Sequence, residues 1–224
     1  SEDTPPTGYS QTGFSDDCDS SGSVTLNAGD SKTCTITNDD QPGVLKVVKV
    51  LTNDNGGGKG LGDFTIHVSG VNANNTSPAA SESGVFVSLD QGDYSVTEDA
   101  VTGYETTLSA DCVGYMNPGD SKTCTITNDD VQPKLTVTKE VKNDNGGSAT
   151  ADKWTLKVGE TTFTSGVEQG INAGTYTVSE SGPSGYSATF SEVCAGGSIT
   201  LNVGDVKTCT ITNDDVQPKL TVTK

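Results

Sequence analysis

The chain contains no arginine, a single histidine and few aromatic residues, which make up 5% of its 224 residues. Protein-binding surfaces usually collect exposed aromatic or arginine anchors, so this scarcity weighs against a recognition module. No apolar run approaches the roughly 20 residues that span a bilayer, and neither a signal peptide nor a basic or lipidated end is present. We therefore expect no membrane span within these residues, and any export signal or anchor outside them.

Positive charge is scarce as well: 13 lysines stand against 30 acidic residues, which gives a net charge of −17. Such a surface repels a phosphate backbone, so nucleic acid is not an expected partner. Only 31% of the residues are hydrophobic and 27 are glycine, which favours several small cores separated by many turns. Small cores bury little apolar surface and are usually cross-linked.

The six cysteines fall in three pairs without the C-x-x-C spacing or the histidine partners of a zinc site. The predicted disulfides are Cys18 with Cys34, Cys112 with Cys124 and Cys194 with Cys209. Three disulfides indicate an oxidising compartment. Each pair flanks a Gly-Asp turn, so we expect it to join the last two strands of a hairpin and to contribute roughly 3 kcal/mol.

The sequence repeats itself with a unit of about 85 to 90 residues. The string TCTITNDD occurs at residues 33–40, 123–130 and 208–215, and similar strings precede and follow it. The repeat predicts four segments: the C-terminal part of a unit at 1–41, complete units at 42–131 and 132–216, and the first strand of a following unit at 217–224. Two explanations of the incomplete ends stay open, a window on a longer chain and strand exchange between neighbouring molecules.

Nearly every segment of a unit alternates with period two between turn residues, which predicts about seven short strands and no helix. In the second complete unit the expected strands are 134–142, 152–158, 161–164, 167–171, 174–180, 185–194 and 206–213. Strands of this length and spacing form a β-sandwich. The sequence therefore predicts tandem all-β sandwich domains.

The same alternation turns three polar residues of each unit towards the core. A lysine shares the inner face of the first strand, a glutamate follows in phase in the fifth strand, and an asparagine follows in phase in the last strand. The two sets are Lys49, Glu98, Asn128 and Lys139, Glu180, Asn213, and the incomplete units carry Glu2, Asn38 and Lys224 at equivalent positions.

Buried lysine and glutamate side chains need partners, so the three residues are expected to meet. Burial lowers the pKa of an amine and raises the pKa of a carboxylic acid, so such a pair can be neutral. A neutral amine held against the asparagine carboxamide can attack it and expel ammonia, while the acid moves the protons. The alternative is a lysine that buries its stem, extends its amine to water and forms only a salt bridge with the glutamate.

These residues resemble the CnaB-type, prealbumin-like (SpaA-like) repeat domains of surface adhesins and pilus shafts. The resemblance rests on the lysine of the first strand, the G-x-Y-x-V-x-E stretch at 174–180, the P-x-G-Y stretch at 183–186 and the final asparagine. It covers both complete units and parts of both incomplete ones. It implies Ig-like sandwiches with self-made isopeptide bonds, Lys49 to Asn128 and Lys139 to Asn213, with Glu98 and Glu180 as proton shuttles.

This sequence departs from the family pattern in two ways. Val101 and Thr102 stand where the family usually has proline. Paired cysteines are not a usual feature of the family, so disulfides replacing the isopeptide bonds remain an alternative.

Acidic pairs at the joints between units lie close to the NDNGG loops at 53–57 and 143–147. The loops lack the EF-hand spacing and its terminal glutamate, so we interpret them first as Asn-Gly turns. Calcium is the alternative, with Asp39, Asp40, Asp54, Asp129, Asp130 and Asp144 as candidate ligands. Asn74 and Asn75 begin N-x-S/T sequons and are candidate glycosylation sites.

Two isolated residues are interpreted structurally. His67 alternates out of phase with its apolar neighbours and should face solvent, without a serine or cysteine partner for catalysis. Trp154 continues the apolar face of Leu156 and Val158 and should lie in the core.

We expect an extracellular structural protein, on a cell surface or in a secreted filament, whose cross-linked repeats form a stalk or filament shaft. Its partners would be other copies of itself or further repeats of the same chain. The alternative is an adhesin in which a loop such as 71–83 contacts a partner, and the scarcity of aromatic and arginine anchors favours the shaft. We expect no enzyme activity on a substrate, and at most a single reaction of the protein with itself.

Overall fold

Buried and exposed side chains alternate along the strands, as in β10 (Lys134–Lys142), where Leu135, Val137 and Lys139 are buried. The computed structural model describes residues 2–224 and contains 17 strands and four short 3-10 helices in that part of the chain. The predicted all-β class is confirmed. Backbone contacts divide the chain into two compact units, residues 2–51, 60–100 and 106–128, and residues 52–59, 101–105 and 129–224.

The N-terminal segment forms a two-stranded antiparallel sheet of β1 (Tyr9–Asp16) and β2 (Cys34–Asp40). The register pairs Tyr9 with Asp40 and Gln11 with Asn38, and a bulge follows between Gln11 and Gly13. The repeat aligns them with the strands at 104–108 and 121–130 of the first complete unit, which has one more strand, at 113–116, between the two.

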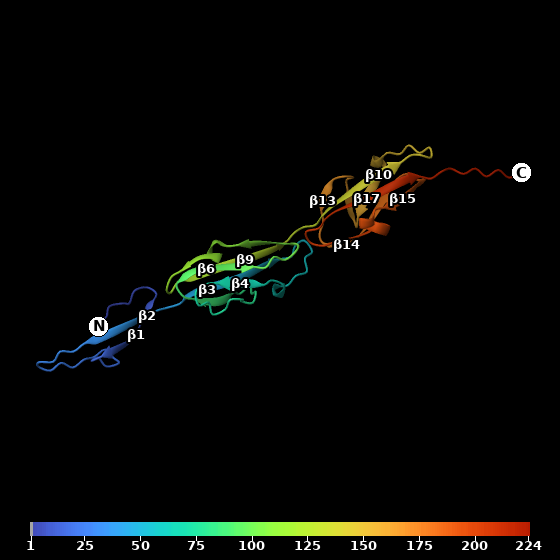
Figure 1. Cartoon of the computed structure of the whole chain (residues 1–224). Coiled ribbons are helices and arrows are strands. Elements are labelled where there is room, and N and C mark those ends of the chain that lie inside the picture. Colours follow the sequence, from blue (N-terminus) through green and yellow to red (C-terminus); the bar gives the residue numbers. More distant parts are fainter. Residues whose placement is uncertain (1) are drawn as a thin grey trace. The chain divides into compact units, whose positions relative to one another are not determined.

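The first complete repeat is built from two sheets. Strands β3 and β9 run side by side in Figure 1, at the centre of the larger sheet. In order, this sheet contains β5 (Val85–Leu89), β3 (Gly43–Thr52), β9 (Ser121–Asp130) and β7 (Tyr104–Leu108). The smaller sheet contains β4 (Ile66–Ser69), β6 (Gly92–Glu98) and β8 (Val113–Met116), and the short helices are η1 (Leu61–Asp63) and η2 (Ala110–Cys112).

The second repeat has the same plan with four strands in each sheet. One sheet contains β13 (Glu168–Gly170), β10, β17 (Val206–Asp215) and β15 (Tyr186–Phe190). The other contains β12 (Thr161–Phe163), β11 (Thr155–Val158), β14 (Gly174–Ser181) and β16 (Ser198–Leu201), and the short helices are η3 (Ala151–Lys153) and η4 (Glu192–Gly197).

The first and last strands of the second repeat, β10 and β17, lie next to each other and run parallel. This pairing determines which buried polar side chains are neighbours. In this register Lys139 of β10 stands opposite Ile211 of β17. Asn213 lies two residues beyond Ile211 and therefore on the same face of the sheet. Lysine and asparagine are thus diagonal neighbours on adjacent strands.

The sequence predicted the strands of this repeat well but missed one. The expected strand 152–158 begins as η3, and the expected strand 185–194 ends at Phe190 before η4. Gly196 and Gly197, the last two residues of η4, have positive φ angles of 65° and 76°, which glycine adopts without strain, and the unpredicted strand β16 begins directly after them. The helices among residues 2–224 are all short 3-10 turns, which agrees with the expected all-β fold.

All three predicted disulfides are present, but the predicted hairpin is wrong in the complete repeats. Cys112 lies in η2 and Cys124 in β9, and the strands that flank the Gly-Asp turn, β8 and β9, belong to different sheets. The same holds for Cys194 in η4 and Cys209 in β17. These bonds therefore fasten the connection between the two sheets onto the last strand.

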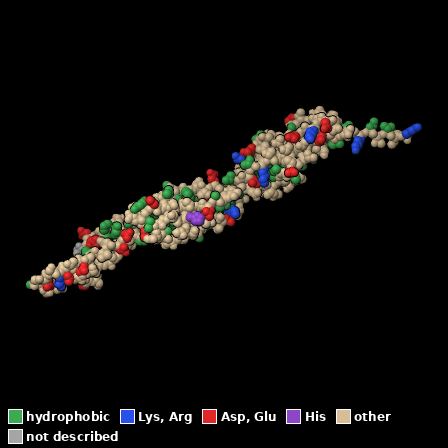
Figure 2. All heavy atoms as spheres, viewed as in Figure 1, with side chains coloured by type: hydrophobic (Ala, Val, Ile, Leu, Met, Phe, Trp, Pro, Cys, Tyr) green, Lys and Arg blue, Asp and Glu red, His purple; other side chains and the backbone are tan. Residues whose placement is uncertain are grey.

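Each repeat has its own hydrophobic core, and Trp154 is buried in the second one, as predicted. His67 is exposed, as predicted, and its Nε2 lies 3.1 Å from Asp99 Oδ1. On the face drawn in Figure 2 acidic side chains are spread among basic ones without a large hydrophobic patch. Among the described residues, no helix is long and apolar enough to cross a membrane.

Candidate cross-linking sites

Three strands of the first repeat bring one polar side chain each to the same buried position. Lys49 comes from β3, Asn128 from β9 and Glu98 from the end of β6 in the opposite sheet. Lys49 and Asn128 are 0% exposed, and the side chain of Glu98 is 1% exposed. Alternation places these side chains inside because each is in phase with apolar residues of its own strand.

The amine of Lys49 is directly hydrogen-bonded to both other side chains. Lys49 Nζ donates to Asn128 Oδ1 and to Glu98 Oε1. On the other side, Asn128 Nδ2 donates to Thr106 Oγ1 at 3.0 Å, and Thr106 Oγ1 lies 3.4 Å from Glu98 Oε2, to which it donates. The ring of Phe64 covers the amine, with its centroid 4.1 Å from Lys49 Nζ.

The second repeat assembles the corresponding three residues. Lys139 Nζ lies 2.5 Å from Asn213 Oδ1 and 2.9 Å from Glu180 Oε2. The ring of Trp154 takes the place of the phenyl ring, 4.8 Å from Lys139 Nζ. Across the sheet Asn213 faces Ala188, where the first repeat has Thr106.

Burial lowers the pKa of both Lys49 and Lys139 below the ordinary lysine value, and the hydrogen-bonded glutamate beside each amine acts in the opposite direction. A lowered pKa increases the fraction of neutral amine, which is the nucleophilic form. The amine, the carboxamide and the carboxyl group are therefore arranged for an acyl transfer within the protein.

The N-terminal segment contains two of the three residues. Asn38 Nδ2 donates to Glu2 Oε1 at 2.7 Å, as the alignment of the repeats leads one to expect. Lys224, which aligns with Lys49 and Lys139, is exposed and lies outside any strand. The sequence did not indicate Thr106, because nothing in its own segment reveals which residue of another strand it faces.

A second cluster lies where each last strand ends. Both oxygens of Asp130 accept backbone N–H groups of the NDNGG loop: Asp54 at 2.9 Å, Asn55 at 3.0 Å and Gly57 at 2.6 Å. The hydroxyl of Tyr104 donates to Asn53 Oδ1 at 2.6 Å and accepts the backbone N–H of Lys59. We call Asp130, Tyr104 and the loop 53–57 the loop clamp of the first repeat.

The second repeat has an equivalent loop clamp. Asp215 accepts the backbone N–H groups of Asp144 at 2.9 Å, Asn145 and Gly147 at 2.6 Å. Tyr186 donates to Asn143 Oδ1 at 2.7 Å. Burial acts to raise the pKa of Asp130 and of Asp215, but the backbone N–H donors outweigh it and hold both values below the ordinary range.

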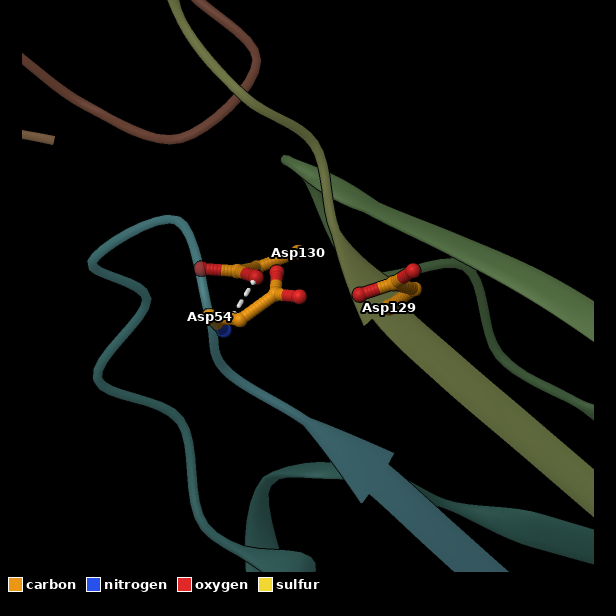
Figure 3. Close-up of side chains that lie close together, drawn as sticks. All are labelled: Asp54, Asp129 and Asp130. Carbon is orange, nitrogen blue, oxygen red and sulfur yellow. Dashed lines mark hydrogen bonds between the residues drawn. The ribbon is translucent and has the colours of Figure 1, made fainter. Parts of the chain in front are cut away.

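Four of the six predicted calcium ligands lie in two acidic groups, and the second group also contains Asp214 and Asp215, which were not among the predicted ligands. Carboxylate oxygens of Asp54, Asp129 and Asp130 lie within 4.8 Å of one another, as do those of Asp144, Asp214 and Asp215. In Figure 3 the side chains of Asp54 and Asp130 lie side by side, and the side chain of Asp129 projects from the end of β9. Asp39 and Asp40 belong to no such group among residues 2–224. Because N–H groups already contact both oxygens of Asp130, the loop clamp accounts for that carboxylate without an ion, and calcium stays a prediction.

The predicted glycosylation sites lie in the connection between β4 and β5. Asn74 is exposed, and its Oδ1 accepts the backbone N–H of Ser88 at 2.9 Å. Asn75 is half-buried, and its Oδ1 accepts the N–H of Ser77 at 3.2 Å. The sequons stay predictions.

A family model described as a prealbumin-like fold domain matches the chain twice, at residues 40–129 and 130–211. No curated protein matches the chain. Among solved structures, the TIE protein of Bacillus anthracis shares 16% identity and a TM-score of 0.46 over 83% of this chain and 38% of that one. The pilus adhesin SpaC of Lactobacillus rhamnosus GG shares 14% identity and a TM-score of 0.30 over 84% of this chain and 31% of that one.

The major pilin of Streptococcus pyogenes shares 14% identity and a TM-score of 0.31 over 79% of this chain and 99% of that one. The chain thus spans well under half the length of the first two proteins and nearly the whole length of the third.

Proposed function

The chain belongs to the prealbumin-like fold domain family, and on that basis we propose that it is part of an extracellular stalk or filament shaft whose repeats are closed by internal amide bonds. The observation that carries the proposal is the contact of a buried lysine amine with an asparagine carboxamide and a glutamate, made twice in one chain. The bonds proposed are Lys49 to Asn128 and Lys139 to Asn213.

The proposed reaction follows from the contacts in the first repeat. Lys49 passes a proton to Glu98, and its neutral Nζ attacks Cγ of Asn128. The Nζ–Cγ bond forms, the Cγ–Nδ2 bond breaks and ammonia leaves, with one proton lost from Nζ and one gained by Nδ2. Phe64 keeps bulk water from the amine, which favours its neutral form and strengthens the polar contacts.

Such bonds suit a protein that bears load. The proposed amide joins the first strand of a repeat to its last, and these strands lie side by side in one sheet. It closes a loop of 79 residues, whereas Cys112 and Cys124 close one of 12. By loop entropy the two closures are worth about 4.5 and about 3 kcal/mol. The amide would therefore stabilise the repeat more than the disulfide does. It would also transmit a pulling force directly from the first strand to the last.

The surface and the disulfides support the same function. Three disulfides fit an oxidising environment outside the cell. Three large aromatic side chains are exposed in the described part of the chain, Phe86 by 64%, Tyr115 by 46% and Tyr9 by 42%. They lie on β5, β8 and β1, which belong to three different sheets. Separate rings of this kind do not form the cluster of anchors that a binding face usually has, so the shaft is favoured over the adhesin.

Intact mass spectrometry of the reduced, denatured chain tests the amide bonds. We expect a mass lower than the calculated one by two ammonia molecules, with Lys49→Ala and Lys139→Ala each restoring one. The full calculated mass would show that the sites hold only salt bridges. For the shaft itself, electron microscopy of the native material should show filaments or stalks, and finding dispersed monomers alone would contradict it.

A further inference from the structure

One position beside the cross-linking site differs in every copy of the repeat. The residue that faces the asparagine is Gln11 in the N-terminal segment and Ala188 in the second repeat. In the first repeat Thr106 hydrogen-bonds to the corresponding asparagine. The lysine, glutamate and asparagine themselves are the same in both complete repeats. The residue that faces the asparagine can therefore make amide formation differ between the repeats.

Thr106 completes a closed circuit of hydrogen bonds in the first repeat. The carboxyl group of Glu98 uses its two oxygens differently, with Oε1 accepting from Lys49 Nζ and Oε2 accepting from Thr106. Thr106 in turn accepts from Asn128 Nδ2 at 3.0 Å. The hydroxyl thus touches the nitrogen that must leave and the acid that must supply its proton.

We propose that the hydroxyl of Thr106 relays the proton from Glu98 to the departing nitrogen of Asn128, so that the first repeat forms its amide faster than the second. The inference rests on the amide-forming function proposed above. In the resting carboxamide, Nδ2 is a donor. Once Nζ has bonded to Cγ, Nδ2 becomes a pyramidal amine with a free electron pair, and the rotatable hydroxyl can donate to it.

The proton balance closes on these residues alone. The ammonium group of Lys49 first passes one proton to Glu98, which then carries it on Oε2. After the attack, Nζ gives its second proton to Oε1, Oε2 gives the first one to the Thr106 oxygen, and the Thr106 hydroxyl gives its own to Nδ2. The Cγ–Nδ2 bond then breaks and ammonia leaves. Of the two protons lost by Nζ, one stays on Glu98 and the other is replaced on Nδ2, and Thr106 is unchanged.

The second repeat has no hydroxyl at this position. The side chain of Glu180 is 10% exposed against 1% for Glu98, so solvent can reach the acid there and carry the proton instead. A mobile water molecule is less well positioned than a fixed hydroxyl group to pass a proton to the departing nitrogen. We expect about tenfold slower bond formation in the second repeat, less than the 10²–10⁴ typical of direct acid–base catalysis, because water partly replaces the relay.

The experiment measures both bonds in the same molecules. Full-length chain is made by cell-free synthesis and quenched in acidic denaturant at intervals, and peptides joined through Lys49–Asn128 and Lys139–Asn213 are quantified after digestion. Thr106→Val, which keeps the branched shape, should slow the first bond about tenfold and leave the second unchanged. Thr106→Ser should restore the rate, and Ala188→Thr should accelerate the second bond.

Three outcomes separate the inference from the proposed function. A Thr106→Val chain that closes the first bond at the wild-type rate overturns the relay. So does an Ala188→Thr chain that closes the second bond no faster, and this variant decides the question even where Thr106→Val folds poorly. Absence of both joined peptides from the wild-type chain overturns the amide-forming function itself.

Discussion

The two complete repeats contain the same three polar residues but bury them to different degrees. In the first, Lys49 and Asn128 are fully buried, whereas Lys139 and Asn213 keep 5% and 3% of their surface exposed. The difference does not come from the three residues, which are identical, but from side chains on other strands. The environment of each buried amine is thus set by neighbours that are distant in sequence.

The aromatic residue above each amine illustrates this. Phe64 lies 4.1 Å from Lys49 Nζ, and Trp154 lies 4.8 Å from Lys139 Nζ. Trp154 also meets the ring of Tyr186 edge to face, with centroids 5.2 Å apart. In the second repeat the aromatic cover of the amine is therefore packed against a residue of the loop clamp.

The largest expected effect comes from removing one proton carrier. Glu98→Gln keeps the shape of the side chain but cannot take the proton of Lys49, so the first bond should not form while the second still does. The mass deficit should fall from two ammonia molecules to one, and the first repeat should lose about 4.5 kcal/mol of stability. Mass spectrometry and calorimetry measure the two effects.

Glu180→Gln is the matched change in the second repeat, and the exposed Glu105, changed to Gln, is the control that should alter nothing. If the Glu98→Gln chain still loses two ammonia molecules, glutamate is not the proton carrier and the comparison between the sites has to be redrawn.

A smaller effect is expected from the loop clamp. Asp130→Ala leaves three backbone N–H groups of the NDNGG loop without their carboxylate, and we expect a loss of about 2 kcal/mol, since water can replace only part of these bonds. Urea unfolding measures it. Asp129→Ala, at the exposed neighbouring position, is the control. Equal stability of the two variants would mean that the loop does not depend on Asp130.

The loop clamp also predicts how stability depends on pH. The pKa of Asp130 is lowered in the folded protein, so its contribution is present above the unfolded value of about 3.9 and is lost as the pH falls through the folded value. In Asp130→Asn this contribution is absent, so the unfolding free energy should fall less steeply between neutral and acidic pH. Urea titrations across this range test it, and parallel curves for variant and wild type would count against the lowered pKa.

Much of this architecture could be predicted from the sequence because strands have a fixed period. Once a segment alternates, the inward position of Lys49 or Asn213 follows from phase alone. Tandem repeats then test the interpretation, because equivalent residues of each copy have to face the core. The β-sandwich was predicted in this way, whereas the prealbumin-like fold was implied by the resemblance of Lys139, Glu180 and their surrounding motifs to that family, and the family match confirms it.

What the sequence could not supply is which strands become neighbours. The disulfide of Cys112 and Cys124 looked like a hairpin staple because the flanking strands are adjacent in sequence, but they lie in different sheets. Thr106 was missed for the same reason. The role of Asp130 also depends on a loop more than 70 residues earlier, whose N–H groups carry no sequence signal of their own.

The smallest expected effect tests whether the loop clamps, unlike the cross-linking sites, are equal in the two repeats. Tyr104→Phe removes a hydroxyl that donates to Asn53, and Tyr186→Phe removes the one that donates to Asn143, at nearly the same distance. Each should cost about 1 kcal/mol in urea unfolding, against no change for the exposed Tyr115→Phe.

Because phenylalanine keeps the edge contact with Trp154, equal losses would show that the hydroxyls act only within the loop clamps. A clearly larger loss in Tyr186→Phe, accompanied by slower closure of the Lys139–Asn213 bond, would instead mean that the clamp and the cross-linking site of the second repeat are coupled through Trp154. The two repeats would then differ in how their parts depend on one another, and not only in how tightly the amine is enclosed.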